Sequence, residues 1–238
     1  MKRLSKKKLN VITALILTVI TVGFATVCFI PDQTVMLTGG KAYSPIYNGN
    51  RQNNCVAIMI NVYEGSDIVS DMLDVLKEKG AKATFFIGGC WADDNEELVL
   101  KIAEEGHELG SHGYFHKDHS KLDEKGNIEE MQLTDNLIRK ITGLDTTLFA
   151  PPSGAFSSVT LKIAEKMGYK TIMWSKDTVD WRDKSKEIVY NRATKNISAG
   201  DFVLMHPKEH TLQALPEILD YYKKIGLSAV TVSACIGE

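Results

Sequence analysis

Short apolar runs recur through most of the chain and alternate with amphipathic stretches. The runs cover residues 56–60, 83–87, 108–110, 147–149, 171–174, 202–205 and 229–232. Continuous apolar runs of this length are typical of strands that are buried on both faces. The stretches between them, such as 68–79 and 98–105, have helical spacing of apolar residues. Several end in a glycine that suits a helix C-cap, namely Gly80, Gly106, Gly168 and Gly226.

This alternation of strand and helix predicts an α/β fold. Strands that alternate with helices pair in parallel and are joined by crossover helices. We therefore expect residues 55–238 to form a distorted (β/α) barrel of about seven parallel strands. An open, doubly wound sheet is the alternative.

The first part of the chain has a different pattern. Residues 11–30 form a run of 20 residues without a charge, and five basic residues lie among the first eight. A helix of this length spans the apolar core of a bilayer, and basic residues before it favour a cytoplasmic N-terminus. We expect a basic cytoplasmic segment at 1–10, a single transmembrane helix at 11–30 and a linker at 31–54. A cleaved signal peptide is the alternative. Both interpretations place residues 55–238 outside the cytoplasm, and the uncleaved helix, which we favour, would hold them at the cell membrane.

Composition narrows the function classes. The chain has 238 residues, of which 44% are hydrophobic and 24% charged, as in ordinary globular proteins. The formal net charge of −2 becomes −7 once the five N-terminal basic residues are left out. The sequence has no basic stripe, which nucleic-acid binding requires, and no Cys-x-x-Cys spacing, which is typical of a zinc module. Nucleic acid is therefore excluded as a partner. A disulfide is permitted outside the cytoplasm, but Cys55, Cys90 and Cys235 cannot all pair within one chain, so we expect at least one of them to be a small buried residue.

Polar clusters follow the predicted strands. They lie at residues 61–65, 111–116, 150–154, 177–181 and 204–206. In a β/α barrel the positions after the strands meet at one rim, where active sites lie. The sequence therefore predicts a polar site at this rim.

His112 and His116 are the clearest candidates for metal binding. Their spacing of four residues lets two imidazoles face one ion from a helical turn or tight loop. Glu64, after another strand, would complete a set of two histidines and a carboxylate. Zinc suits such ligands, as do cobalt and nickel.

Taken together, the motifs carry a family resemblance. Those that carry it are SHGYFH at 111–116, PPSG at 151–154, DTVDW at 177–181, LMH at 204–206, ATFFIG at 83–88 and GHELGSH at 106–112. In this order they resemble the five motifs of the polysaccharide deacetylases, carbohydrate esterase family 4. The resemblance extends over residues 55–235.

The resemblance implies a metal-dependent hydrolase that removes acetyl groups from amino-sugar polymers of the cell envelope, such as peptidoglycan or chitin-like oligomers. It implies one divalent metal held by Glu64, His112 and His116. His206 would be the general acid, oriented by Asp180. The residues implied to bind substrate are Trp181, Leu204 and, through a nearby backbone N–H, Ser153.

Three positions depart from the family pattern. The first motif, normally Thr-Phe-Asp-Asp-Gly, reads Asn-Val-Tyr-Glu-Gly, so Tyr63 replaces the general base and Glu64 the metal-binding Asp. Ala150 replaces the Arg that pairs with that base. A neutral Tyr with a pKa near 10 accepts a proton poorly at pH 7. Glu64, a metal-bound hydroxide, Asp67 or Asp177 are alternative bases.

Two functions therefore remain open. The first is a slow deacetylase, favoured by His112, His116, Asp180 and His206. The second is an impaired relative that binds glycan without turnover, favoured by Tyr63 and Ala150. The other histidines, His107, His119 and His210, are interpreted as structural or surface residues.

Overall fold

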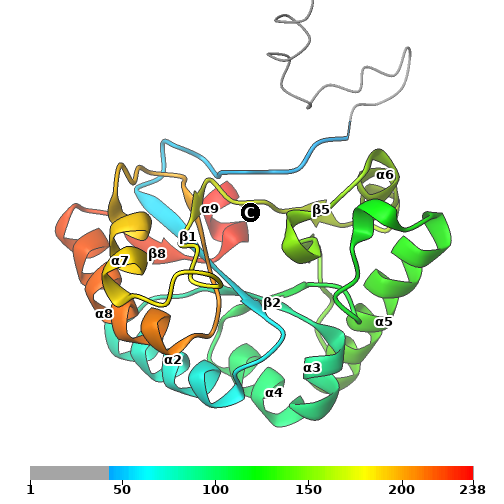
Figure 1. The fold of residues 1–238 in the computed structure, drawn as a ribbon, viewed down its shortest axis with the longest axis horizontal. Helices are drawn as coiled ribbons and strands as arrows, with labels where there is room; N and C mark the ends of the chain where they lie inside the picture. Colours follow the sequence, from blue (N-terminus) through cyan, green and yellow to red (C-terminus); the bar gives the residue numbers. More distant parts are fainter. Residues whose placement is uncertain (1–42, 238) are drawn as a thin grey trace, which may run out of the picture. The chain divides into compact units, whose positions relative to one another are not determined.

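The computed structural model describes residues 43–237, in which helices lie along the outer side of a curled parallel sheet (Figure 1). The strands are β1 (Cys55–Val62), β2 (Thr84–Ile87), β3 (Glu108–Ser111), β4 (Leu148–Phe149), β5 (Lys170–Thr171), β6 (Lys176–Asp177), β7 (Phe202–Met205) and β8 (Ser228–Val230). The α-helices are α2 (Ser66–Lys79), α3 (Gly89–Asp94), α4 (Glu96–Glu104), α5 (Glu124–Thr142), α6 (Ser158–Lys166), α7 (Lys186–Thr194), α8 (Glu209–Lys224) and α9 (Val232–Ile236). Two 3₁₀ turns are η1 (His119–Lys121) and η2 (Pro152–Gly154).

The sheet is parallel throughout, as the alternation of elements predicts. Its order is β5-β4-β3-β2-β1-β7-β6, with β8 paired to the beginning of β1. The sheet has eight strands, one more than the apolar runs indicate, because β6 consists of two charged residues, Lys176 and Asp177. Among the described residues β5 and β6 do not pair, so the predicted barrel is an open, curled half-barrel. Its longer helices all lie on the outer side and, of the described helices, only the short α9 packs on the inner side, whereas a doubly wound sheet carries layers of helices on both faces.

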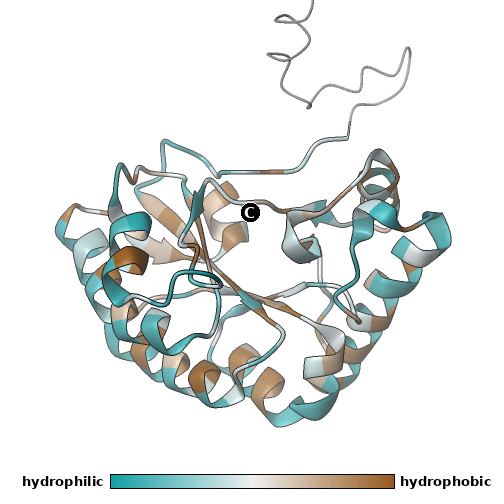
Figure 2. Cartoon of the chain, viewed as in Figure 1, coloured by the Kyte–Doolittle hydropathy of each residue, from teal (hydrophilic) through white to brown (hydrophobic). Residues whose placement is uncertain are grey.

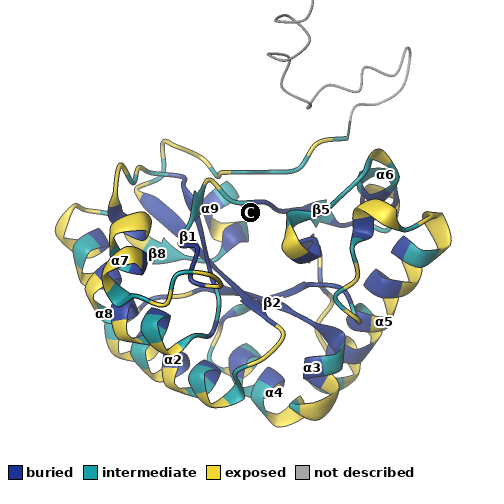
Figure 3. Ribbon diagram, in the orientation of Figure 1, coloured by how far each residue is buried: buried dark blue, intermediate teal, exposed yellow. Residues whose placement is uncertain are grey.

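Strand β1 shows why the apolar runs are continuous. All eight of its residues are buried. Val56, Ile58 and Ile60 face the large core under the helices, whereas Ala57 and Met59 face the inner side of the curled sheet. Because successive side chains of a strand point to opposite faces, burial of both faces requires apolar residues at every position. Figure 3 shows this burial along β1 and β2.

Helix α2 illustrates how the outer layer forms. Its buried residues Val69, Met72, Leu73 and Leu76 recur at intervals of three and four, which places them on one helical face. Gly80 ends the helix at φ 64°, a left-handed conformation that glycine adopts without a Cβ clash. The outer helices accordingly carry mixed apolar and polar positions in Figure 2, with apolar residues on the side that packs on the sheet.

Residues 43–54 bind to the half-barrel through their backbone. Ile46 forms a parallel bridge with Ile172, just after β5, and Asn48 an antiparallel bridge with Asp201, just before β7. Gly49 lies so close to α9 that a Cβ there would be 2.3 Å from the Cys235 carbonyl oxygen. This part of the expected linker therefore packs against the domain.

The inner side of the sheet is closed by α9. The thiols of Cys55, on β1, and Cys235, on α9, are both buried, and their sulfur atoms lie 3.5 Å apart. They fill the inner core with Val232.

The expected cytoplasmic segment, the transmembrane helix at 11–30 and the first part of the linker lie outside the described residues. Within 43–237, none of the helices has the length and apolar character needed to cross a bilayer.

Candidate active site

The predicted site residues gather at the carboxyl edge of the sheet. Tyr63 and Glu64 follow β1, His112 and His116 follow β3, and His206 follows β7. Because these strands are parallel, the loops after them open on the same side of the half-barrel. The rim predicted from the sequence therefore exists, and the charge of His206 contributes to the pKa of Glu64, His112 and His116, as expected for neighbours.

His112 is a buried, neutral imidazole. It directly follows β3, and its backbone N–H continues the sheet by donating to the Ile87 carbonyl at 2.9 Å. Its Nδ1 lies 2.7 Å from the Ala150 carbonyl oxygen. A carbonyl only accepts, so Nδ1 carries the proton and Nε2 keeps a free lone pair. Burial, and next the charge of His116, lower the pKa of His112 to about 3. A neutral imidazole with a free Nε2 is the form that binds a metal.

His116 lies beside His112 and under Tyr63. The His116 ring centroid is 5.1 Å from that of His112 and 4.9 Å from that of Tyr63. The His116 backbone is left-handed, with φ 53°. This conformation is rare for a residue with a side chain and is often found at functional sites. Burial lowers the pKa of His116. The two imidazoles thus meet as the spacing predicts.

Tyr63 stands where the family has its general base. The ring packs on Gly88, where a Cβ would lie 2.3 Å from a ring carbon, so only glycine leaves room for it. Burial, followed by the nearby Cys90 and Glu130, raises the pKa of Tyr63 above its ordinary value of 10.0. The phenol therefore stays protonated at neutral pH and supplies no base.

His206 and Asp180 form the pair expected of an oriented acid. The Asp180 carboxylate is within 2.7 Å of both the backbone N–H and Nδ1 of His206. Asp180 is 1% exposed. Burial opposes its ionisation, yet the hydrogen bonds and charge of His206 outweigh this and lower the pKa of Asp180. The bond at Nδ1 fixes the tautomer and ring orientation and leaves Nε2 of His206 free.

Glu64 is held by a lysine. Its carboxylate forms an ion pair with Nζ of Lys208, and this bond, followed by the charge of Lys208, lowers the pKa of Glu64. The Glu64 side chain is 67% exposed.

A divalent metal, implied by the resemblance, fits this site only in part. His112 offers a neutral imidazole with a free Nε2, and His116 lies beside it. Glu64 is engaged elsewhere, and the described residues contain no group of three His, Cys, Asp or Glu side chains placed to hold a metal. As they stand, these residues do not form a three-ligand site.

The predicted substrate-binding residues lie in or just after strands β4, β6 and β7 of the same sheet. Trp181 is 57% exposed on the loop after β6, with the Arg182 guanidinium over its ring. Leu204 is buried in β7, and its carbonyl accepts a hydrogen bond from the Thr178 hydroxyl at 2.8 Å. Ser153 lies exposed in η2 with φ 55°. At Ala150 no side chain reaches beyond Cβ, so only its carbonyl serves the site, through His112.

Three residues of the site escaped the sequence argument. The hydroxyl of Thr211 donates to Asp180 at 2.7 Å, and the His210 ring lies 2.8 Å from the Asp180 carbonyl oxygen. Lys208 holds Glu64. All three lie at or just before the start of α8, within five residues of His206. This proximity in the sequence is the one feature that could have identified them as site residues. His210 has a structural role, as expected, because its ring supports the Asp180 backbone. His107 and His119 are buried, structural residues.

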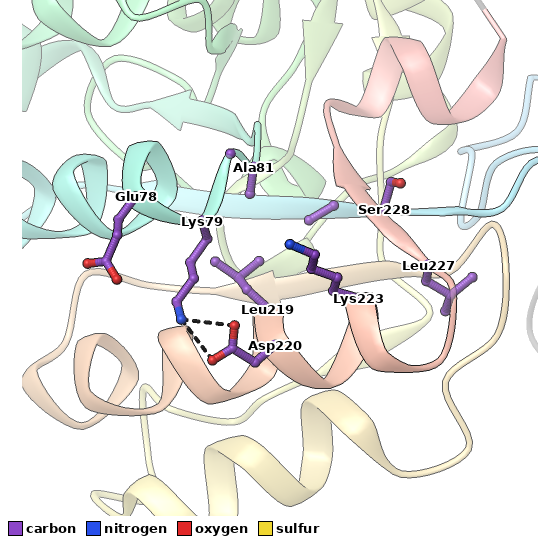
Figure 4. Close-up of a pocket in the computed structure, with 10 residues that line it drawn as sticks. Glu78, Lys79, Ala81, Leu219, Asp220, Lys223, Leu227 and Ser228 are labelled. Carbon is purple, nitrogen blue, oxygen red and sulfur yellow. Dashed lines mark hydrogen bonds and ion pairs between the residues drawn. The ribbon is translucent and has the colours of Figure 1, made fainter.

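A separate hollow of about 500 Å³ lies between the ends of α2 and α8 and the beginning of β8, as Figure 4 shows. It is at the amino edge of the sheet, opposite the histidines. Lys79 and Asp220 in its wall pair with each other at 2.7 Å. Its lining holds no histidine or cysteine, so we assign the candidate site to the rim instead.

The curled parallel half-barrel, with two imidazoles and a His–Asp pair at its carboxyl edge, defines an α/β half-barrel domain with a candidate active site. More narrowly, the chain belongs to the polysaccharide deacetylase family, whose model matches residues 48–172. This confirms the resemblance seen in the motifs.

Relatives extend the match over most of the domain. The chain is 37% identical over 194 residues to the uncharacterised protein YlxY of Bacillus subtilis, covering 82% of this chain and 61% of that protein. It is 35% identical over 190 residues to a peptidoglycan-N-acetylglucosamine deacetylase of Bacillus cereus, covering 76% of this chain and 88% of that protein.

Among solved structures, a carbohydrate esterase family 4 pseudoenzyme from Bacillus anthracis matches with a TM-score of 0.80 and 32% identity, over 83% of this chain and 70% of that one. A mutant of that pseudoenzyme, described as having restored enzymatic activity, matches with a TM-score of 0.80 and 30% identity, over 83% of this chain and 73% of that one.

Proposed function

We propose that this chain is a slow deacetylase of N-acetylated amino-sugar polymers of the cell envelope, with peptidoglycan as the first candidate. Family membership supports the reaction class, and two matching relatives are named as peptidoglycan deacetylases. The observation that carries the proposal is the His206–Asp180 pair, because a buried carboxylate that holds Nδ1 of an imidazole and leaves its Nε2 free is an arrangement suited to proton transfer.

In this proposal His206 protonates the leaving amine from Nε2. Asp180 accepts a hydrogen bond from the Nδ1–H of His206 and, staying ionised, stabilises the imidazolium that exists before transfer. Thr211 and the His206 backbone N–H fix the carboxylate, so the ring keeps its direction during turnover. The acid half of an amide hydrolysis is therefore complete.

The base half is incomplete. Tyr63 keeps its proton at neutral pH, and Ala150 supplies no guanidinium. Loss of a general base costs about 10²- to 10⁴-fold in rate. The divalent metal, with zinc, cobalt or nickel as candidates, stays a prediction whose third ligand, Glu64, must first leave Lys208. The missing general base and the engaged Glu64 both predict a low turnover number.

A second candidate is glycan binding without turnover. Tyr63 packing on His116 and Lys208 binding Glu64 favour it, since both occupy groups that hydrolysis would need. The similarity to a family 4 pseudoenzyme supports the same alternative.

Acetate release separates the two candidates. The full chain is incubated with acetylated peptidoglycan fragments and chitin oligomers in the presence of zinc or cobalt, and His206→Ala is the matched control. Acetate above this control supports the deacetylase. Saturable binding with no acetate supports the second candidate, and absence of both contradicts both.

We further propose that the domain works outside the cytoplasm, tethered to the membrane by residues 11–30. The uncharged run and the basic residues before it support this. Protease added to intact cells should digest the domain. Protection of the domain until the cells are lysed would contradict the proposal.

A further inference from the structure

Exposed aromatic side chains lie at the same edge of the sheet as the histidines. Phe115 is 50% exposed, Trp181 57% and Tyr63 38%. They belong to the loops after β3, β6 and β1. Single exposed apolar residues are ordinary, but aromatic rings gathered around one polar site indicate a binding surface.

The sheet order spreads these rings along the edge that carries the histidines. Phe115 shares the loop after β3 with His112 and His116, whereas Trp181 follows β6, one strand beyond the β7 loop of His206. In the order β3-β2-β1-β7-β6, the loop of Phe115 and the loop of Trp181 each lie two strands from the loop of Tyr63. Neighbouring strands are about 4.8 Å apart, so the loop of Phe115 and the loop of Trp181 each lie about 10 Å from the loop of Tyr63 along the edge. A ligand that touches both Phe115 and Trp181 is therefore longer than one sugar ring.

Phe115 is held in place although its ring is exposed. The Phe115 backbone N–H donates to Oε2 of Glu130 at 2.8 Å. Lys117 Nζ lies 4.9 Å from the Phe115 ring centroid and 3.0 Å from the other Glu130 oxygen. The Tyr114 ring meets the Phe115 ring edge-on, with centroids 4.7 Å apart.

Glu130, on α5, is 0% exposed. A buried carboxylate must be satisfied by partners, and here these partners are the backbone and the lysine that flank the Phe115 ring. Fixing the ring before binding reduces the entropy lost on association. This construction is what distinguishes Phe115 from an incidental exposed residue.

We propose that Phe115 is a sugar-stacking platform that extends the site along an acetylated amino-sugar chain of several rings. The apolar C–H face of a pyranose packs on the aromatic ring, and the Lys117 ammonium beside it meets hydroxyl or carboxylate oxygens of the same chain. This inference rests on the proposed function, because it assumes that the site takes this class of glycan.

The test is a calorimetric titration of the full chain with acetylated glucosamine oligomers of increasing length. Wild type should bind longer oligomers more tightly. Phe115→Ala should weaken binding of the longest oligomers about 10-fold, since burying an aromatic face contributes about 1.4 kcal/mol or more. The shortest oligomers, which reach only the histidines, should bind unchanged, and Phe115→Tyr should restore the affinity.

Leu144→Ala is the matched control. Leu144 is also 50% exposed but lies between α5 and β4, at the opposite edge, so its loss should change no affinity. Unchanged affinity of Phe115→Ala for long oligomers, or an equal loss at every length, overturns the platform. If wild type binds no oligomer at all, the proposed function fails and the platform fails with it.

Discussion

The carboxylate of Asp180 binds His206 twice, at the backbone N–H and at Nδ1, each at 2.7 Å. This relationship joins the loop after β6 to the end of β7 and fixes the direction of a catalytic candidate. The same hydrogen bonds therefore serve both the structural and the chemical role of Asp180.

We predict that Asp180→Asn lowers the free energy of unfolding by about 1–3 kcal/mol. The amide oxygen can still accept from the His206 N–H and the Thr211 hydroxyl, which both bond to Oδ2, but the amide NH₂ then faces Nδ1 of His206, whose charge-assisted hydrogen bond is lost in a buried place. Urea denaturation measures the change. Thr211→Val, which removes a single donor, should cost about 1 kcal/mol. Equal stability of Asp180→Asn and wild type would contradict the account.

Stability should fall in mild acid partly because of His107. Burial, followed by the charge of Lys82, lowers the pKa of His107 to about 4, while unfolded histidine titrates near 6.5. The unfolded state thus binds a proton first as pH falls. The contribution of His107 is complete above pH 6.5 and is lost between 6.5 and about 4, at about 1.4 kcal/mol per unit.

The matched variant for this prediction is His107→Asn. Its side-chain oxygen can accept the Ala83 N–H that now donates to Nδ1 of His107, and it does not titrate. Urea denaturation at several pH values should give a shallower loss for the variant. His112, with a pKa of about 3, leaves a residual slope in both proteins. Identical slopes would argue against a neutral, buried His107.

Removing Lys208 should strengthen metal binding. Lys208→Met frees the Glu64 carboxylate and removes a positive charge near the incoming ion, so zinc affinity should rise about 10-fold by calorimetry. The double variant Lys208→Met/Glu64→Gln is the control and should lose this gain. An unchanged affinity in Lys208→Met would show that Glu64 is not available as a ligand.

Much of the fold follows from the pattern of apolar residues. Each of the seven runs overlaps a strand. The overlap is best for β1, β2 and β7, which are buried throughout and therefore need apolar residues on both faces. Strand β6 could not be predicted in this way. It consists of Lys176 and Asp177, both half-buried, and it exists because β7 offers backbone partners. The barrel is open because, within residues 43–237, the edge strands β5 and β6 do not pair, and the pattern of apolar residues does not encode which strands pair.

The candidate site was predictable where one loop carries the information. His112 and His116 come from the same loop, and their rings meet. Glu64 illustrates the opposite case, since its partner Lys208 lies 144 residues further along the chain and belongs to another loop. Whether Glu64 binds the Lys208 ammonium or a metal ion depends on distances between loops. The spacing of residues within one motif does not encode these distances.

The central claim is that the acid half of a deacetylase site is complete and the base half is missing. Acetate release by Tyr63→Asp, measured beside wild type with the same acetylated glycan and metal, tests it most directly. Tyr63 is 38% exposed, so a carboxylate at this position leaves the core intact. We expect a gain of about 10²- to 10⁴-fold that disappears when His206→Ala is added. Equal rates for wild type and Tyr63→Asp would contradict the claim.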